Sequence, residues 1–241
     1  MAEEAADLSG IAVIFDLDGT LIDSAGQIHA TVNRVLGGMG LPETARATVQ
    51  GFVGNGLPVL IDRLLAHHAH PLPPEARAGL IARFEAEYSR EHGLTTLYPG
   101  VRAALEALRG AGAALGVCTN KPIAPARAVL DHLGLTPLFG AVLGGDSLPV
   151  RKPDPDHLRA TARALARPGV IFVGDSEVDA ETAKAAGVPF LLFSEGYRKS
   201  PVEAIFHSAV FADWAEVPGL VREVSGGLSA VGQICKPLKS L

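Results

Sequence analysis

The sequence predicts an α/β protein with a Rossmann-like core, in which helices cover both faces of a parallel sheet to give three layers, and with an inserted all-helical cap domain. Three features support this prediction. Short runs rich in Val, Ile, Leu and Phe recur along the chain, helical patterns separate the later runs, and one long interval contains helical patterns alone. At 241 residues, of which 48% are hydrophobic, the chain can bury a core of this size.

The predicted strands are short and continuously apolar. Such runs are typical of strands that are covered on both faces, because neither side of the strand then meets water. The first run, "IAVIF", leads directly into Asp16 and Asp18. The sequence predicts strands at residues 11–15, 113–118, 141–143, 170–173 and 189–193, with a weaker one at 209–211.

Helical patterns lie between the later strands. The first of them opens at Pro99 and closes with a glycine, as helix ends commonly do. Because strand and helix alternate, the connections should be right-handed crossovers and the strands parallel. The sequence predicts these helices at residues 99–112, 124–135, 155–166 and 178–187.

Residues 25–93 interrupt this alternation. The interval contains helical segments but no convincing strand, and roughly 70 residues are far too many for a connecting loop. We therefore expect a separate helical domain at 25–93, inserted into a core domain formed by residues 1–24 and 94–225. Residues 226–241 are expected to form a flexible tail.

The charge and the apolar runs argue against several classes of protein. The net charge is −5 and Lys and Arg form no run, which makes a nucleic-acid-binding surface improbable. The N-terminus lacks the basic and apolar regions of a signal peptide, and no run of about 18 apolar residues could span a membrane. We expect a cytoplasmic protein, monomeric or homodimeric, that acts on a small metabolite.

Polar side chains follow several predicted strands at the point where each strand ends. In an open parallel sheet, ligands bind beyond the carboxyl ends of the strands, so these side chains outline a candidate site. The candidates are Asp16, Asp18, Gly19 and Thr20 after the first strand, Thr119, Asn120 and Lys121 after the second, Lys152 in "RKPDP", and Gly174, Asp175, Ser176, Glu177 and Asp179 after the fourth.

The acidic residues of this site need a cation. Two carboxylates about 4 Å apart repel one another by about 4 kcal/mol at an effective dielectric constant near 20. Oxygen ligands select a hard ion, and a site with few protein ligands and a phosphate to share favours Mg²⁺ over Ca²⁺. Lys152 would add a second positive charge. The sequence therefore predicts a magnesium site at this edge of the sheet.

Four motifs of this region resemble a known family. "FDLDGTLIDS", "CTN", "RKPDP" and "GDSEVD" occur in the order of the signature motifs of the haloacid dehalogenase superfamily, and the resemblance spans about residues 11 to 225. The longer stretches "GFVGNGLPVLIDRLL", "CTNKP", "RKPDPDHL" and "SEGYR" are similar to bacterial phosphoglycolate phosphatases. The resemblance implies a Mg²⁺-dependent phosphatase with a cap domain, whose expected reaction is the hydrolysis of 2-phosphoglycolate to glycolate and phosphate.

The resemblance also implies roles for individual residues. Asp16 would attack phosphorus to form an aspartyl-phosphate, and Asp18 would protonate the leaving alkoxide and later accept a proton from water. Thr119 and Asn120 would bind the transferring oxygens, and Thr20 would also contact substrate. The implied catalytic residues are Asp16, Asp18, Thr119 and Lys152, and the implied metal site consists of Asp16, the Asp18 backbone carbonyl, Asp175 and, through a bound water, Asp179.

Two stretches of the predicted cap contain residue types that bind ligands in other proteins. "VGNGLP" is typical of a loop that opens a helix, and backbone N–H groups at a helix N-terminus can hold a carboxylate. We therefore expect Gly54, Asn55 and Gly56 to bind the carboxylate of the substrate, although Asn55 could instead act as an N-cap. "HHAH", at residues 67–70, resembles a metal-binding cluster, but histidines facing the negative end of a helix explain it better.

The motifs leave alternative functions open. A phosphatase for another sugar phosphate and a mutase similar to β-phosphoglucomutase share the superfamily, and Thr20 favours a phosphatase because the mutases usually have valine at that place. A non-catalytic phosphate-binding or scaffold protein is the alternative of another class. The presence of Asp16, Asp18, Lys152 and Asp175 argues against it.

Overall fold

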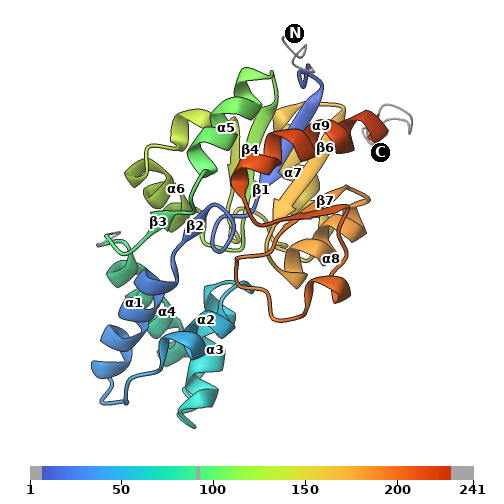
Figure 1. Cartoon of the computed structure of the whole chain (residues 1–241). Helices are drawn as coiled ribbons and strands as arrows, with labels where there is room; N and C mark the ends of the chain where they lie inside the picture. The colour runs from blue at the N-terminus through green and yellow to red at the C-terminus, as the bar shows by residue number, and fades with distance from the viewer. Residues whose placement is uncertain (1–6, 91–92, 229–241) are drawn as a thin grey trace, which may run out of the picture.

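A computed structural model describes residues 7–90 and 93–228 and has a six-stranded parallel sheet at its centre (Figure 1). The strand order is β5-β4-β1-β6-β7-β8. The strands are β1 (Ile11–Phe15), β4 (Ala114–Cys118), β5 (Ala141–Leu143), β6 (Gly169–Gly174), β7 (Phe190–Phe193) and β8 (Ala209–Phe211). All six predicted strands are confirmed, and their observed ends differ from the predicted ones by at most one residue.

β1 lies between β4 and β6, and the three strands end almost level. Phe15 is paired with Val117 of β4 and with Val173 of β6. The chain runs outward from β1 to β4 and β5 and then crosses back to β6, so the direction of winding changes beside β1. Ligands bind at such a switch point in open α/β sheets. The topology therefore directs the search for a site to the carboxyl end of β1.

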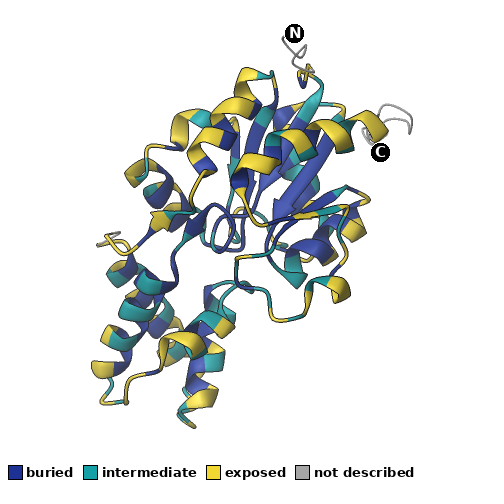
Figure 2. Ribbon diagram, viewed as in Figure 1, coloured by how far each residue is buried: buried dark blue, intermediate teal, exposed yellow. Residues whose placement is uncertain are grey.

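Helices cover both faces of the sheet. Val13 and Phe15 of β1 belong to a hydrophobic cluster with α5, α6 and α9, whereas Ala12 and Ile14 belong to a cluster with α7 and α8. This division follows because successive side chains of a strand point to opposite faces. Figure 2 shows the buried strands between helices whose outer surfaces are exposed. The helices are α5 (Val101–Gly110), α6 (Ile123–His132), α7 (Pro155–Leu165), α8 (Glu177–Ala186) and α9 (Val217–Leu228), with the short 3₁₀ helices η1 (Thr136–Leu138), η2 (Val202–Ala204) and η3 (Trp214–Glu216).

Four further helices lie between β1 and β4 in the sequence and project from the carboxyl end of the sheet (Figure 1). They share a hydrophobic cluster of their own, which includes Val32, Val49, Leu64 and Phe84, one from each helix. The predicted helical character of the insertion is confirmed, while its status as a separate domain stays a prediction. The helices are α1 (Ala25–Gly37), α2 (Arg46–Phe52), α3 (Leu57–His67) and α4 (Pro74–Tyr88).

A short antiparallel ribbon lies where this insertion begins and ends. β2 (Ile22–Asp23) and β3 (Thr96–Leu97) pair with Ile22 opposite Leu97. Strands of two residues are too short for a periodic pattern, so the sequence could not predict them. The ribbon brings the two ends of the insertion to the same place.

The helix α9 is not among the predicted elements. Its segment, "VPGLVREVSGGL", contains Pro218 and three glycines, residues that weaken a helical pattern. α9 continues to Leu228 and so includes the first three residues of the predicted tail; residues 229–241 lie outside the described part of the chain. Within residues 7–90 and 93–228, no helix is both long enough and apolar enough to cross a membrane.

Candidate active site

Three buried carboxylates form an acidic group at the carboxyl end of the sheet. Asp16 follows β1, Asp175 follows β6, and Asp179 lies in the first turn of α8. One carboxylate oxygen from each lies within 4.8 Å of the others. The sequence predicted these three residues to share a site, and the structure brings them together.

Local hydrogen bonds hold Asp179 in place. Ser176 is the N-cap of α8, and its hydroxyl and backbone N–H donate to Asp179 Oδ2 at 2.6 and 3.1 Å. This is a capping box, in which the third residue of a helix and the N-cap satisfy each other's backbone groups. The Asp175 N–H also donates to Asp179 Oδ2 at 3.3 Å. The motif "GDSEVD" therefore folds so that both of its aspartates face the sheet edge.

Lys152 lies among these carboxylates. Its Nζ is 2.9 Å from Asp16 Oδ1 and 2.6 Å from Asp179 Oδ1, and its side chain is 1% exposed. The sequence prediction that Lys152 adds a positive charge to the site agrees with this position. One buried ammonium group thus lies between two of the three carboxylates of the acidic group.

The balance of charge in the acidic group remains negative. Burial raises the pKa of Asp16 to about 6, although the charge of Lys152 acts in the opposite direction. Burial and the charges of Asp179 and Asp16 raise the pKa of Asp175 well above its ordinary value. Burial alone would lower the pKa of Lys152, but the neighbouring Asp16 and Asp179 outweigh it and keep the pKa high. The site therefore holds a charged lysine and carboxylates that are costly to ionise without a further cation.

Gly19 allows the chain to turn back over this group. Its φ is +88°, and a Cβ at this position would come within 2.5 Å of Asp175 Oδ2. The turn places Thr20 so that its hydroxyl donates to Asp175 Oδ1 at 2.6 Å. The sequence predicts a substrate contact for Thr20, whereas the structure directs its hydroxyl to a carboxylate of the acidic group.

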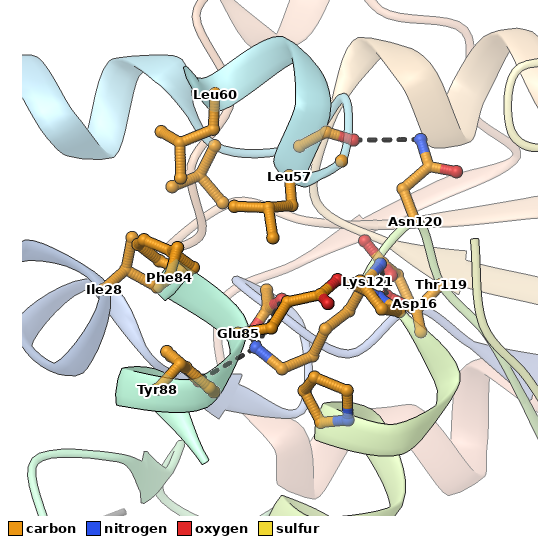
Figure 3. Close-up of a pocket in the computed structure, with 16 residues that line it drawn as sticks. Asp16, Ile28, Leu57, Leu60, Phe84, Glu85, Tyr88, Thr119, Asn120 and Lys121 are labelled. Atoms are coloured by element: carbon orange, nitrogen blue, oxygen red, sulfur yellow. Dashed lines mark hydrogen bonds and ion pairs between the residues drawn. The ribbon is translucent and has the colours of Figure 1, made fainter. Parts of the chain in front are cut away.

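Asp18 lies beside the acidic group with a different set of partners. Its Oδ1 accepts hydrogen bonds from the Ser24 hydroxyl at 2.6 Å and from Lys121 Nζ at 3.1 Å, and its Oδ2 is 3.2 Å from the same Nζ. Lys121 also donates to the Tyr88 hydroxyl of α4 at 2.8 Å (Figure 3). Lys121 follows the second predicted strand, and the sequence alone indicates no role for it. Its contact with Tyr88 joins residues 33 positions apart, which no local pattern reveals.

Thr119 and Asn120 line the same cavity as Asp16 and Asp18. The Thr119 hydroxyl accepts a hydrogen bond from the Lys121 N–H at 3.3 Å, which leaves its proton for another acceptor. The Asn120 side-chain amide donates to the backbone carbonyls of Gly54 and Lys152, at 3.1 and 3.0 Å. Asn120 therefore links the sheet edge to the helical insertion.

The loop Gly54–Gly56 closes the cavity from the side of the insertion. Gly54 and Gly56 line the cavity, whose volume is about 60 Å³. Gly56 has a φ of +86°, and a Cβ on it would lie 3.1 Å from the Asn120 carbonyl oxygen. The Asn55 amide oxygen accepts a hydrogen bond from Arg63 at 2.9 Å. The structure brings this predicted loop to the site, but the Asn55 side chain already has a partner within the insertion.

Tyr197 connects the acidic group to the start of the insertion. Its backbone N–H donates to Asp175 Oδ2 at 2.6 Å. Its hydroxyl donates to Asp23 at 2.8 Å and accepts from the backbone N–H groups of Ser24 and Ala25 at 2.9 and 3.0 Å. The stretch "SEGYR" predicts a loop with a packed tyrosine, and Tyr197 is buried there.

The histidines of "HHAH" lie away from the acidic group. α3 ends at His67, and His68 Nε2 lies 2.7 Å from the Thr44 hydroxyl. The expectation that they end a helix is confirmed. Among the described residues, the group of His, Cys, Asp and Glu side chains close enough to hold a metal does not include them.

The chain is similar to a known family over the segment that contains this site. The sequence profile of the haloacid dehalogenase-like hydrolases matches residues 12–187. The chain belongs to this family. The matched segment begins in β1 and ends just after α8, so it includes the acidic group, Lys152 and the whole helical insertion.

Several curated haloacid dehalogenase-like relatives are similar along most of the chain. A phosphoglycolate phosphatase of Cereibacter sphaeroides is 50% identical over 213 residues, which cover 88% of this chain and 98% of that protein. A phosphoglycolate phosphatase of Rhodobacter capsulatus is 45% identical over 215 residues, which cover 88% of this chain and 96% of the relative. The similarity therefore extends through both the sheet and the insertion.

Two solved structures have a similar fold along most of the chain. A predicted phosphoglycolate phosphatase from Haemophilus somnus superposes with a TM-score of 0.81 at 30% identity, over 87% of this chain and 97% of that one. CbbY from Rhodobacter sphaeroides, solved in complex with phosphate, superposes with a TM-score of 0.74 at 22% identity, over 86% and 95% of the two chains. The predicted resemblance in fold and family is thus confirmed.

The acidic group of this haloacid dehalogenase-like hydrolase fits a hard divalent cation. Asp16, Asp175 and Asp179 offer only oxygen atoms, and within the described part of the chain they are the residues grouped closely enough for a shared ion. Burial is the main cause that raises the pKa values of Asp16 and Asp175, so both carboxylates are costly to ionise unless a cation lies beside them. Oxygen ligands and negative charge are what a hard ion requires.

Proposed function

We propose that this hydrolase is a Mg²⁺-dependent phosphatase that converts 2-phosphoglycolate to glycolate and phosphate. The observation that carries the proposal is the acidic group with Lys152 between Asp16 and Asp179 at the carboxyl end of β1. Phosphoryl transfer depends on in-line positioning and on charge stabilisation; Lys152 and a bound cation would supply the charge stabilisation. The substrate is proposed from the relatives named phosphoglycolate phosphatase, which are similar over nearly their whole length.

In the first proposed step, Asp16 attacks phosphorus. A bond forms between its carboxylate oxygen and phosphorus while the bond to the ester oxygen breaks. Asp18 gives a proton to the departing alkoxide, and glycolate leaves. Lys152 stabilises negative charge on Asp16 and on the phosphoryl oxygens. Its Nζ lies 2.9 Å from Asp16 Oδ1.

In the second step, water hydrolyses the aspartyl-phosphate. Asp18 accepts a proton from the water, whose oxygen attacks phosphorus and displaces the Asp16 carboxylate. We propose that the Thr119 hydroxyl and the Asn120 backbone N–H contact the transferring oxygens, since both residues line the cavity. Phosphate release returns Asp16 to its starting state.

Mg²⁺ is the proposed cation, held by the side chains of Asp16 and Asp175 and the backbone carbonyl of Asp18, with Asp179 as an orienting neighbour. It would supply charge compensation for the carboxylates and the phosphoryl oxygens. Thr20 and Tyr197, which both donate to Asp175, hold one of these ligands in position.

The proposal is tested by phosphate release from a panel of small phosphomonoesters, assayed with Mg²⁺ and with a chelator. We expect 2-phosphoglycolate to have the highest kcat/KM and the chelator to abolish the activity. Preference for a sugar phosphate would replace the proposed substrate. Sustained formation of glucose 6-phosphate from β-glucose 1-phosphate without phosphate release would indicate a mutase instead.

Mg²⁺ should stabilise the protein more at pH 7.5 than at pH 5. The folded-state pKa of Asp16 is raised from 3.8 to about 6, and that of Asp175 is raised as well. Between about pH 4 and 6 the metal-free folded state therefore binds more protons than the unfolded chain, so its free energy of unfolding falls as the pH rises. Mg²⁺ binds the ionised carboxylates and offsets this loss.

The measurement is the melting temperature with and without Mg²⁺ at the two pH values. The control is Asp175→Asn, in which a metal ligand is lost and the Mg²⁺-dependent shift should be much smaller. An equal Mg²⁺-dependent shift at pH 5 and pH 7.5 would contradict the argument.

Asn55→Ala should raise the KM for phosphoglycolate more than the KM for p-nitrophenyl phosphate. Asn55 accepts a hydrogen bond from Arg63 and so helps to shape the loop Gly54–Gly56, which we propose to contact the substrate. The loop is expected to contact the carboxylate, which p-nitrophenyl phosphate lacks. Equal changes in the two KM values would show that the loop does not distinguish the substrates.

The domain boundaries at residues 25 and 93, the cytoplasmic location, and the monomeric or homodimeric state stay predictions from the sequence. Truncation at those boundaries, fractionation of cells and light scattering would test them in turn.

A further inference from the structure

We propose that Lys121 binds the carboxylate of the substrate and makes the enzyme selective for phosphate esters whose leaving group is an anion. This inference rests on the proposed function and names a specificity-determining residue for it. It adds a charged residue to the sequence-based expectation that the loop Gly54–Gly56 binds the carboxylate.

The cavity above Asp16 has a basic side chain in its lining, and this side chain could bind a small anion. Its walls are largely apolar, with Ile28, Leu57 and Phe84 among them (Figure 3). Its charged lining is otherwise acidic, since Glu85 joins Asp16 and Asp18. Among the described residues that line the cavity, Lys121 is the one basic side chain. A carboxylate that enters this space without a cation beside it would be strongly disfavoured.

The position of Lys121 matches the place where the substrate carboxylate must lie. Asp18 has to reach the ester oxygen in order to protonate it, which requires a distance of about 3 Å. In phosphoglycolate a single methylene carbon separates that oxygen from the carboxylate, so ordinary bond lengths put the two groups about 3 Å apart. Lys121 Nζ lies 3.1 and 3.2 Å from the two oxygens of Asp18. An ammonium next to Asp18 is therefore within reach of the carboxylate of the bound substrate, and we place the carboxylate on that side.

Tyr88 holds the ammonium group at the wall of the cavity. Its hydroxyl accepts a hydrogen bond from Lys121 at 2.8 Å, and Nζ lies 4.1 Å from the centre of its ring. The lysine side chain is 6% exposed. Because Tyr88 belongs to α4 and Lys121 follows β4, the insertion and the sheet edge together position this charge. A pre-positioned ammonium loses little conformational entropy when the carboxylate binds.

The test compares two substrates that differ in the carboxylate. Ethyl phosphate has the same two-carbon skeleton as phosphoglycolate without the charge, so the ratio of the two kcat/KM values measures selectivity for the carboxylate. In Lys121→Met, whose side chain has similar length and no charge, we expect this ratio to fall by about 10- to 100-fold, the range for a hydrogen bond to a charged group. The matched control is Lys184→Met, which removes an exposed lysine of α8 and should leave the ratio unchanged.

Each outcome bears on a different statement. A wild-type enzyme that prefers phosphoglycolate and a Lys121→Met variant that does not would support the inference. A preference that survives in the variant would overturn the inference and leave the proposed function intact. A wild-type enzyme without the preference would overturn the proposed function itself. Circular dichroism and the melting temperature establish whether the variant is folded; if it is not, Lys121→Gln replaces it in the same comparison.

Discussion

Asp16→Asn should reduce the kcat for phosphate release by at least about 10⁴-fold, which is the scale of effect seen when a nucleophile is removed. The amide of asparagine cannot form the aspartyl-phosphate, because it lacks the negative charge and the nucleophilic oxygen of the carboxylate. The measurement is phosphate release under single-turnover and steady-state conditions. The matched control is Asp156→Asn, which removes an exposed carboxylate at the start of α7. Activity within tenfold of the wild type would contradict the assignment of the nucleophile.

The same variant should remain folded. Asp16 is buried and its pKa is raised to about 6, so at pH 7.5 the metal-free protein carries an ionised carboxylate that folding disfavours. Asparagine removes this cost, and Lys152 keeps Asp179 as a partner at 2.6 Å. We expect the melting temperature of metal-free Asp16→Asn at pH 7.5 to equal or exceed that of the wild type. A much lower value would mean that inactivity reflects unfolding.

Of the substitutions proposed for this site, Lys152→Met should lower the free energy of unfolding most. It should also abolish activity. It leaves the buried Asp16 and Asp179 without their shared ammonium, and breaking a buried ion pair costs about 3–5 kcal/mol. The cost depends on ionisation of the carboxylates. It should therefore be small near pH 4 and grow as the pH rises through the folded-state pKa of Asp16, about 6.

Urea unfolding of the metal-free protein at pH 4.5 and pH 7.5 measures this difference. Lys184→Met, which removes an exposed lysine, serves as the control and should change stability little at either pH. A loss of stability in Lys152→Met that is the same at both pH values would indicate a packing defect instead of unpaired charge.

Most of the predicted residues that the structure brings together follow a strand. Asp16, Thr119 and Asp175 each follow a strand, and parallel strands of one sheet end at the same edge, so the order of the motifs was enough to bring them together. Asp179 was reachable because it lies four residues beyond Asp175, in the first turn of a helix. Lys152 does not directly follow a strand, and its place beside Asp16 was expected from the motif "RKPDP".

The missed residues depend on contacts between distant segments. Lys121 and Tyr88 meet across the boundary between the sheet and the insertion, and Tyr197 reaches Asp23 from 174 positions away in the sequence. Thr20 was placed at the site, but which partner its hydroxyl would choose depended on the turn at Gly19. Hydrogen-bond geometry of this kind is decided by the packed structure, which one sequence without its fold does not reveal.

The β2–β3 ribbon has a consequence for how such a protein can change. The strands on either side of the insertion, β2 and β3, pair with each other. The helices α1 to α4 are therefore connected to the sheet through this two-stranded ribbon. Lengthening or exchanging that appendage need not alter the spacing of the aspartates, because closing a longer loop adds only a small entropic penalty. The aspartates and Lys152 can thus keep their spacing while the insertion varies in length or sequence.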